Sequence, residues 1–212
     1  NKKTTRPLSL SKSDIVSEFV LNKTQVDKID FYLSSIKEYN KHTNLVGKST
    51  IENIWDRHVL DCLQLTKYIT NKKLKILDLG TGAGLPGVLF SIVGYQRVLM
   101  VDSVKKKTDF VMKIIKELSL TAKIQNKRIE KSPTSQHDIV VSRALAPLVK
   151  LLTYARMYSN KNTTLLFLKG RNAISEIDIA TKAYFFEFEK IKSLSSDEGC
   201  VLKINNIKNK NG

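Results

Sequence analysis

The segment "KILDLGTGAGLPGVLF" at residues 75–90 constrains the fold more than any other part of the chain. An apolar run ends at Asp78, and four glycines follow within eight positions. Glycine reaches backbone conformations closed to other residues and lets the backbone approach a ligand closely. The segment therefore predicts a buried strand, a ligand-binding turn and a helix, in that order.

Short apolar runs alternate with helical patterns on both sides of this turn. Strands are expected at 75–79, 97–101, 121–125, 138–142 and 163–168, and helices at 86–93, 104–118, 147–158 and 171–183. This alternation is typical of a parallel, doubly wound sheet. Residues 183–191 and 199–207 are expected to add an antiparallel hairpin at the sheet edge, and residues 206–212 to fray.

The first third of the chain has a different texture. Helices are predicted at 9–22, 24–40 and 51–69, the last capped by Thr50. We therefore expect a helical cap over residues 1–70 and a core over 71–212, forming one structural domain.

The composition of the chain restricts its possible binding partners. A net charge of +16 favours a polyanion such as RNA, although a Lys-, Asn- and Ile-rich coding bias gives the same excess. Cys62 and Cys200 have no metal-ligand spacing, so we expect two reduced, buried thiols and no metal site. No apolar run spans a membrane, and the first residues lack the apolar segment of a signal peptide, so a cytoplasmic location is expected.

Two ligand classes compete for the glycine turn. The turn matches GxGxxG, which is typical of dinucleotide sites. A carboxylate at Asp78 would repel a pyrophosphate but suits the sulfonium and ammonium of S-adenosylmethionine. The carboxylate of that ligand would bind free N–H groups at the helix start. Asp102 ends the next strand, where it either accepts hydrogen bonds from ribose hydroxyls or caps the following helix.

The chain resembles the bacterial small-subunit rRNA guanine-N7 methyltransferases of the glucose-inhibited-division B family. The resemblance implies a class I S-adenosylmethionine-dependent methyltransferase fold: a Rossmann-like, seven-stranded, mostly parallel sheet with helices on both faces and an N-terminal helical cap. The stretches that carry it are "YNKHTNLVG" at 39–47, "RHVLDCL" at 57–63, "LDLGTGAGLPG" at 77–87, "VDSVKKKTDF" at 101–110, "VVSRALAPL" at 140–148 and "LLFLKGR" at 165–171.

The resemblance also implies site residues and partners. Gly80 and Leu85 would touch the cofactor, Ile129 and Glu130 would lie beside its adenine, and Arg143 would face the cofactor or the base. In "NKRIEK" the family more often has Ala where this chain has Ile129, which changes the fit around the adenine. The substrate would be 16S rRNA or the small-subunit ribonucleoprotein, with no membrane partner, and the protein a monomer. The full set expected at the cofactor is Asp78, Gly80, Gly82, Leu85, Asp102, Ile129, Glu130 and Arg143.

Guanine N7 carries an in-plane lone pair at neutral pH, so methyl transfer needs positioning and no general base. Arg143 would donate to guanine O6, or else form a structural salt bridge. The other residues expected at the RNA are Asn44, Arg57, His58, Lys169, Lys105, Lys106 and Lys107. Each has a plainer alternative: a turn for Asn44, a surface ion pair of Arg57 with Asp61, and solvated lysines.

We therefore expect an enzyme that methylates N7 of one guanosine in 16S rRNA. Substrate binding by a small-molecule methyltransferase would depend little on salt concentration, whereas RNA binding weakens as the salt concentration rises. A non-catalytic RNA-binding scaffold would bind no S-adenosylmethionine.

Overall fold

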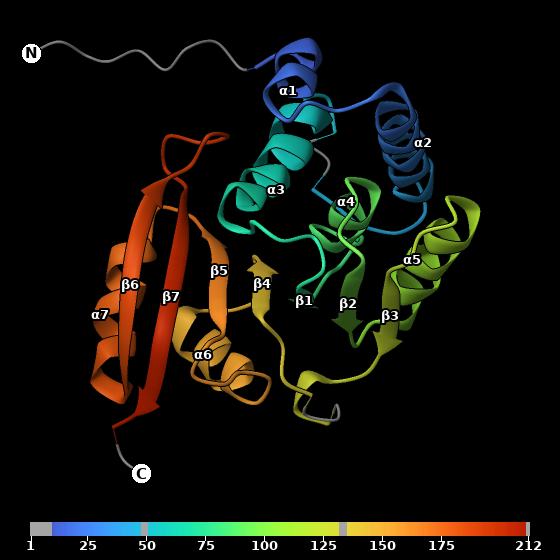
Figure 1. The fold of residues 1–212 in the computed structure, drawn as a ribbon. Coiled ribbons are helices and arrows are strands. Elements are labelled where there is room, and N and C mark those ends of the chain that lie inside the picture. Colours follow the sequence, from blue (N-terminus) through green and yellow to red (C-terminus); the bar gives the residue numbers. More distant parts are fainter. Residues whose placement is uncertain (1–9, 48–50, 132–134, 211–212) are drawn as a thin grey trace, which may run out of the picture.

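The computed structural model describes residues 10–47, 51–131 and 135–210. The N-terminal third is helical, as predicted, and lies over one end of the sheet (Figure 1). Ser11 and Asn22 cap the first two helices through reciprocal side-chain and backbone hydrogen bonds. The helical elements here are α1 (Lys12–Glu18), α2 (Lys23–Tyr39), the π-helical η2 (Trp55–Leu60), α3 (Asp61–Leu63) and the 3₁₀-helical η3 (Gln64–Tyr68).

A seven-stranded sheet forms the rest of the core, in the order β3-β2-β1-β4-β5-β7-β6. All neighbouring pairs are parallel except β5–β7 and β7–β6, so the predicted closing hairpin is confirmed. The strands are β1 (Lys75–Leu79), β2 (Arg97–Asp102), β3 (Lys123–Asn126), β4 (Ile139–Arg143), β5 (Thr164–Lys169), β6 (Tyr184–Lys192) and β7 (Cys200–Asn209). The helices between them are α4 (Gly87–Ile92), α5 (Lys105–Glu117), η4 (Ile129–Lys131), α6 (Leu148–Arg156) and α7 (Ala173–Ala183).

Successive side chains along the strands point to opposite faces of the sheet and so belong to two hydrophobic clusters, one on each face. On β1, Ile76 joins a cluster with α4, α5 and the N-terminal helices, whereas Leu77 and Leu79 join a cluster with α6 and α7. The central strands are buried on both faces, as expected for a parallel sheet covered by helices on both sides.

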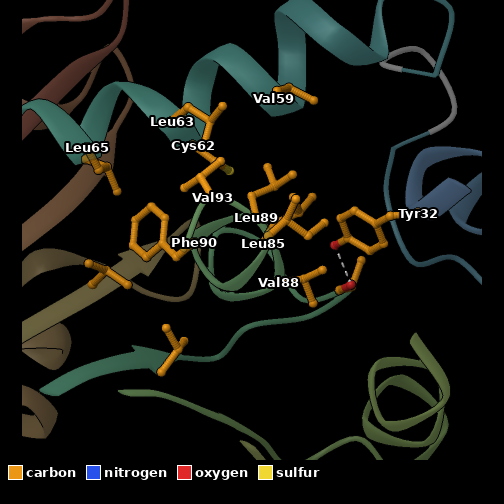
Figure 2. Close-up of a cluster of buried hydrophobic side chains, with 14 of the residues drawn as sticks. Tyr32, Val59, Cys62, Leu63, Leu65, Leu85, Val88, Leu89, Phe90 and Val93 are labelled. Atoms are coloured by element: carbon orange, nitrogen blue, oxygen red, sulfur yellow. Dashed lines mark hydrogen bonds between the residues drawn. The ribbon is translucent and has the colours of Figure 1, made fainter. Parts of the chain in front are cut away.

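The N-terminal helices pack directly against the glycine turn and α4. Figure 2 shows Cys62, Leu63 and Leu65 facing Leu89 and Phe90 of α4. Both cysteines are free and buried, as the sequence predicts, and burial raises the pKa of the Cys62 thiol.

Some local predictions are wrong. The third helix begins later than residue 51 and is mainly π and 3₁₀ in type; its predicted cap, Thr50, lies outside the described residues. Strand β7 continues to Asn209, where the sequence predicts fraying. His137, in the polar stretch before β4, is only 6% exposed, and its ring packs edge-on to Tyr158.

Candidate functional site

The glycine turn connects the carboxyl end of β1 to α4 and is held from below by Asp78. One carboxylate oxygen of Asp78, Oδ2, accepts hydrogen bonds from the Thr81 hydroxyl at 2.5 Å and the Gly87 N–H at 2.9 Å. Gly87 is required there, because a Cβ on it would lie 2.9 Å from that oxygen and 2.4 Å from the Met100 side chain. Asp78 thus ties the start of the turn to the start of the helix.

The position of Asp78 differs from the expected contact with a ligand. Its side chain is fully buried beneath the turn, and Oδ1 has no hydrogen-bond partner among the described residues. Burial raises its pKa from the ordinary 3.8 to about 7, against the hydrogen bonds from Thr81 and Gly87, which lower it. Asp78 therefore holds the loop and is not exposed at its surface.

Gly80 and Gly82 both have positive φ angles, of 67° and 59°, which glycine adopts at little cost. A Cβ on Gly80 would lie 2.4 Å from Leu145 in the loop after β4, whereas a Cβ on Gly82 would meet nothing within 4 Å. Gly80 is therefore needed for both conformation and packing. Gly82 is needed for conformation and faces open space.

Most N–H groups of the turn are already used, contrary to expectation. The N–H groups of Gly80 and Thr81 donate to the Val101 carbonyl, and that of Gly82 donates to Asp102 Oδ2 at 2.9 Å. At the start of α4, Gly87 donates to Asp78. These groups are therefore not free to hold the carboxylate of a ligand.

Two hollows flank the turn, and Gly80 lines both. We call the first the β3 hollow; it is lined by Gly80, Asp102, Ser103, Lys127, Arg128, Ile129, Glu130, Leu145, Ala146, Lys150 and Tyr154. We call the second the cap hollow; it is lined by Leu45, Val46, Gly47, His58, Gly80, Thr81, Gly82, Ala83, Leu85, Lys107, Arg143 and Ala144. A ligand that passes over Gly80 would reach both.

Besides Gly80, the β3 hollow brings together three expected cofactor residues. Asp102 accepts from the Gly82 N–H and, through Oδ1, from the Val104 N–H at 2.9 Å, so it holds the turn and also serves the start of α5. Glu130 accepts from the Tyr154 hydroxyl at 2.8 Å, and hydrogen bonds to its own backbone and to Tyr154 lower its pKa. Ile129 is 7% exposed and packs into the core while lining the hollow.

The cap hollow brings Leu85, His58 and Arg143 together. Arg143 Nε donates to Asp61 Oδ2 at 2.9 Å, and its Nη2 donates to the Arg57 carbonyl at 3.2 Å. Burial, with Arg143 and Arg57 nearby, lowers the pKa of His58 to about 3, so its imidazole is neutral at physiological pH.

The anticipated surface pair of Arg57 with Asp61 is absent from the described residues, where Asp61 pairs with Arg143. The two carboxylate oxygens of Asp61 are engaged by Arg143, Ser195 and Gln64, while Arg57 is exposed. Arg57 contributes its backbone carbonyl to the site.

The structure places Asn44 and Lys169 differently: an RNA contact of Asn44 stays a prediction, whereas Lys169 is neither solvated nor free. Asn44 is exposed, and the turn chemistry belongs to Asn40, whose Oδ1 accepts from Leu45 at 2.7 Å and Val46 at 3.1 Å. The Lys169 side chain is 8% exposed and pairs with Glu176 at 2.6 Å. It also donates to the Ala146 carbonyl, so it braces the loop after β4 and is neither solvated nor placed to meet a phosphate.

The lysines at the start of α5 divide into two kinds. Lys105 and Lys106 are exposed, and Lys105 pairs with Asp109 at 2.8 Å. Lys107 is partly buried and lines the cap hollow.

Sequence reasoning missed several residues that line or support the site. Lys150 and Tyr154 lie four apart on α6, and both face the β3 hollow. Their helical spacing, directly after the strand that ends in Arg143, was a readable signal. Tyr32 lies far away in the sequence, but its hydroxyl donates to the Ala83 carbonyl in the glycine turn at 2.7 Å (Figure 2). Nothing local in the sequence announces that contact.

The profile of the GidB family, described as rRNA small subunit methyltransferase G, matches residues 25–201. A ribosomal RNA small subunit methyltransferase G from Rickettsia prowazekii (strain Madrid E) is 35% identical over 182 residues, covering 86% of this chain and 94% of its own. One of the same name from Cereibacter sphaeroides (strain ATCC 17029 / ATH 2.4.9) is 32% identical over 200 residues, covering 92% and 97%.

Solved structures show a similar fold at low identity. Ribosomal protein L11 methylase from Lactobacillus delbrueckii subsp. bulgaricus has a TM-score of 0.58 and 18% identity, covering 69% of this chain and 76% of its own. A mutant of MtNAS in complex with S-adenosylmethionine has a TM-score of 0.59 and 13% identity, covering 94% and 86%. These likenesses concern the fold, which is that of class I S-adenosylmethionine-dependent methyltransferases.

Proposed function

The chain belongs to the rRNA small subunit methyltransferase G family, and from this premise we propose that it methylates N7 of one guanosine in 16S rRNA. It is an S-adenosylmethionine-dependent rRNA methyltransferase. The observation that carries the proposal is the family match over residues 25–201, together with a glycine turn that opens into two hollows at the carboxyl edge of the sheet.

The residues present fit the cofactor. Asp78 is fully buried, and its Oδ1 is unpartnered among the described residues, so a titratable carboxyl group lies under the turn; in its ionised form this group suits a cationic ligand and would oppose a pyrophosphate. In the β3 hollow, Asp102 and Glu130 offer carboxylate oxygens and Ile129 offers an apolar surface. We assign this hollow to the nucleoside part of the cofactor, and Gly80, Gly82 and Leu85 to the passage between the hollows.

Arg143 takes over the role that the turn N–H groups cannot fill. Arginine carries five N–H donors, and Asp61 and the Arg57 carbonyl use two of them, which leaves three directed to neither partner. Because Arg143 lines the cap hollow, we assign these donors to an acceptor oxygen of a ligand bound there: the cofactor carboxylate or guanine O6.

When bound, S-adenosylmethionine supplies an electrophilic methyl group. The chain needs no general base, because guanine N7 has no proton to lose before it is methylated. Its work is to hold the guanine in line and to exclude water from the cap hollow. A neutral His58 suits this hollow, because it adds no positive charge beside a ring that becomes cationic.

We further propose that the cap over residues 1–70 and the core over 71–212 act as one structural domain, since both contribute to one hydrophobic cluster and to the cap hollow. The exposed Lys105 and Lys106, with Lys127 and Arg128 at the β3 hollow, would meet phosphates of the RNA. We propose a cytoplasmic monomer acting on 16S rRNA or the small-subunit particle. Across the parts of the chain that the structure describes, no helix could span a membrane and no residue cluster could hold a metal.

The test incubates the purified chain with S-adenosylmethionine carrying a labelled methyl group and with small-subunit particles, or with 16S rRNA, from cells that lack the protein. Mass spectrometry of the digested RNA should show one new 7-methylguanosine. Label at another base position would contradict the N7 assignment. Cofactor binding without any RNA label would favour a small-molecule methyltransferase, and no cofactor binding would favour a scaffold.

A further inference from the structure

The ion pair of Arg143 with Asp61 is one end of a longer chain of hydrogen bonds. Asp61 Oδ2 accepts from Arg143 Nε at 2.9 Å, and Asp61 Oδ1 accepts from the Ser195 hydroxyl at 2.6 Å. Gln64 Nε2 donates to the same Oδ1 at 3.2 Å. Both carboxylate oxygens of Asp61 are therefore engaged, which fixes the plane of the carboxylate and so the edge that it presents to the guanidinium.

Ser195 belongs to the turn between β6 and β7, which Gln64 anchors to the N-terminal helical region. Gln64 Oε1 accepts from the Leu194 N–H at 2.8 Å, and its Nε2 donates to the Ser193 hydroxyl at 3.2 Å. Gln64, Ser193 and Ser195 are at most 7% exposed. Buried and mutually bonded polar groups of this kind specify one arrangement.

Three parts of the chain thus determine the position of one guanidinium. Arg143 lies at the end of β4, Asp61 and Arg57 in the third helical stretch contact it directly, and the hairpin turn at residues 193–199 contacts Asp61. The side chains of Arg143 and Asp61 are 21% and 18% exposed, so their pairing is only weakly screened by solvent. The Arg143 donors not taken by Asp61 or Arg57 are aimed by the two that are, because the guanidinium is planar and rigid.

We propose that Asp61 and Ser195 are positioning residues that orient Arg143 toward its ligand in the cap hollow. This rests on the proposed function, in which Arg143 donates to an acceptor oxygen there. Asp61 supplies the negative charge that orients the guanidinium, and the hydrogen bond from Ser195 fixes the orientation of the Asp61 carboxylate. Neither lines the hollow, so both act through Arg143.

A double-mutant cycle tests the proposal, with S-adenosylhomocysteine as the probe in titration calorimetry. Asp61→Asn should raise the Kd about tenfold and Ser195→Ala about threefold, the range expected when a charged or a neutral hydrogen bond is lost. In an Arg143→Gln background, neither change should weaken binding further. The matched controls are Asp27→Asn, which breaks the surface pair with Lys23, and Ser159→Ala, which removes a hydroxyl bonded to the Ala155 carbonyl on α6. Both should bind like the wild type.

Methylation kinetics with RNA identify the ligand oxygen. If Asp61→Asn leaves the Kd unchanged but lowers kcat/KM for RNA, and Arg143→Gln abolishes that difference, Arg143 is aimed at guanine O6 and the proposal stands. The proposal would be overturned if Asp61→Asn and Ser195→Ala weakened binding as much in the Arg143→Gln background as in the wild type. It would also be overturned if they changed neither the Kd nor kcat/KM for RNA. If Asp61→Asn fails to fold, the Ser195→Ala cycle decides alone. A wild-type chain that binds S-adenosylhomocysteine but labels no RNA refutes the proposed function and leaves the cycle readable; one that binds none overturns both.

Discussion

Replacing Tyr32 by phenylalanine tests whether the N-terminal helices stabilise the glycine turn. The Tyr32 hydroxyl is buried on α2 and donates to the Ala83 carbonyl at 2.7 Å, across 51 residues of sequence (Figure 2). Tyr32→Phe removes one oxygen and leaves the ring in place against Phe110. The perturbation is therefore confined to one hydrogen bond between the cap and the turn.

The expected magnitude follows from burial. Ala83 is 3% exposed, so its carbonyl loses a partner without gaining water, at a cost of about 1–3 kcal/mol in the free energy of unfolding. For a chain of this size each kcal/mol lowers the Tm by roughly 2–4 °C. If the turn moves so that water reaches the carbonyl, cofactor binding must restore the original turn conformation. A cost of about 1.4 kcal/mol for that step weakens cofactor binding about tenfold.

Tyr95→Phe is the matched control. Tyr95 is also buried, and its hydroxyl donates to a backbone carbonyl, that of Ile69, at 2.8 Å, away from the glycine turn. Urea unfolding should show comparable losses for the two variants, whereas calorimetry with S-adenosylhomocysteine should show weaker binding only for Tyr32→Phe. Equal binding by both variants would refute the idea that the cap holds the turn.

Three further predictions concern the turn and the surface. Gly82→Val should abolish calorimetric cofactor binding while lowering the Tm by only a few degrees, because the site has open space but requires a positive φ; wild-type affinity would contradict this. Lys105→Glu with Lys106→Glu should weaken RNA binding and flatten its salt dependence while sparing cofactor affinity, and an unchanged RNA titration would remove this patch from the interface. For Asp78, the folded-state pKa of about 7 lies above the ordinary 3.8, so the folded state binds the extra proton and stability falls as pH rises between these values. Asp78→Asn should flatten urea stability over that pH range, and an unchanged slope would count against the buried proton.

The fold was predictable because its signals are periodic. Apolar runs and helical spacing located the strands from β1 to β7 to within a few residues, and the glycine turn fixed where the ligand edge must be. Asp102 and Arg143 could be placed at that edge for the same reason, because each ends a strand there, whereas Glu130 was expected only from the family resemblance.

What could not be predicted depends on long-range contacts. Lys169 reads as a free lysine at a strand end until Glu176 is folded against it. The Arg57–Asp61 spacing indicates an ion pair, but the folded chain brings Arg143 and Ser195 to the Asp61 carboxylate. Ser195 lies 134 residues from Asp61, in a polar turn with no distinguishing pattern. Sequence periodicity reports local geometry, and these contacts are not local.

The hairpin turn that reaches Asp61 also has a consequence for biosynthesis. A ribosome delivers the glycine turn, Asp102 and Arg143 well before it delivers Ser195, because the chain is made from its amino end. A nascent chain that stops before β6 already contains every backbone element of the β3 hollow, yet it lacks the hydroxyl that fixes Asp61. Truncated translation products that end before this turn therefore keep the pairing of Arg143 with Asp61 and the Arg57 carbonyl, but lack one of the hydrogen bonds that orient Asp61.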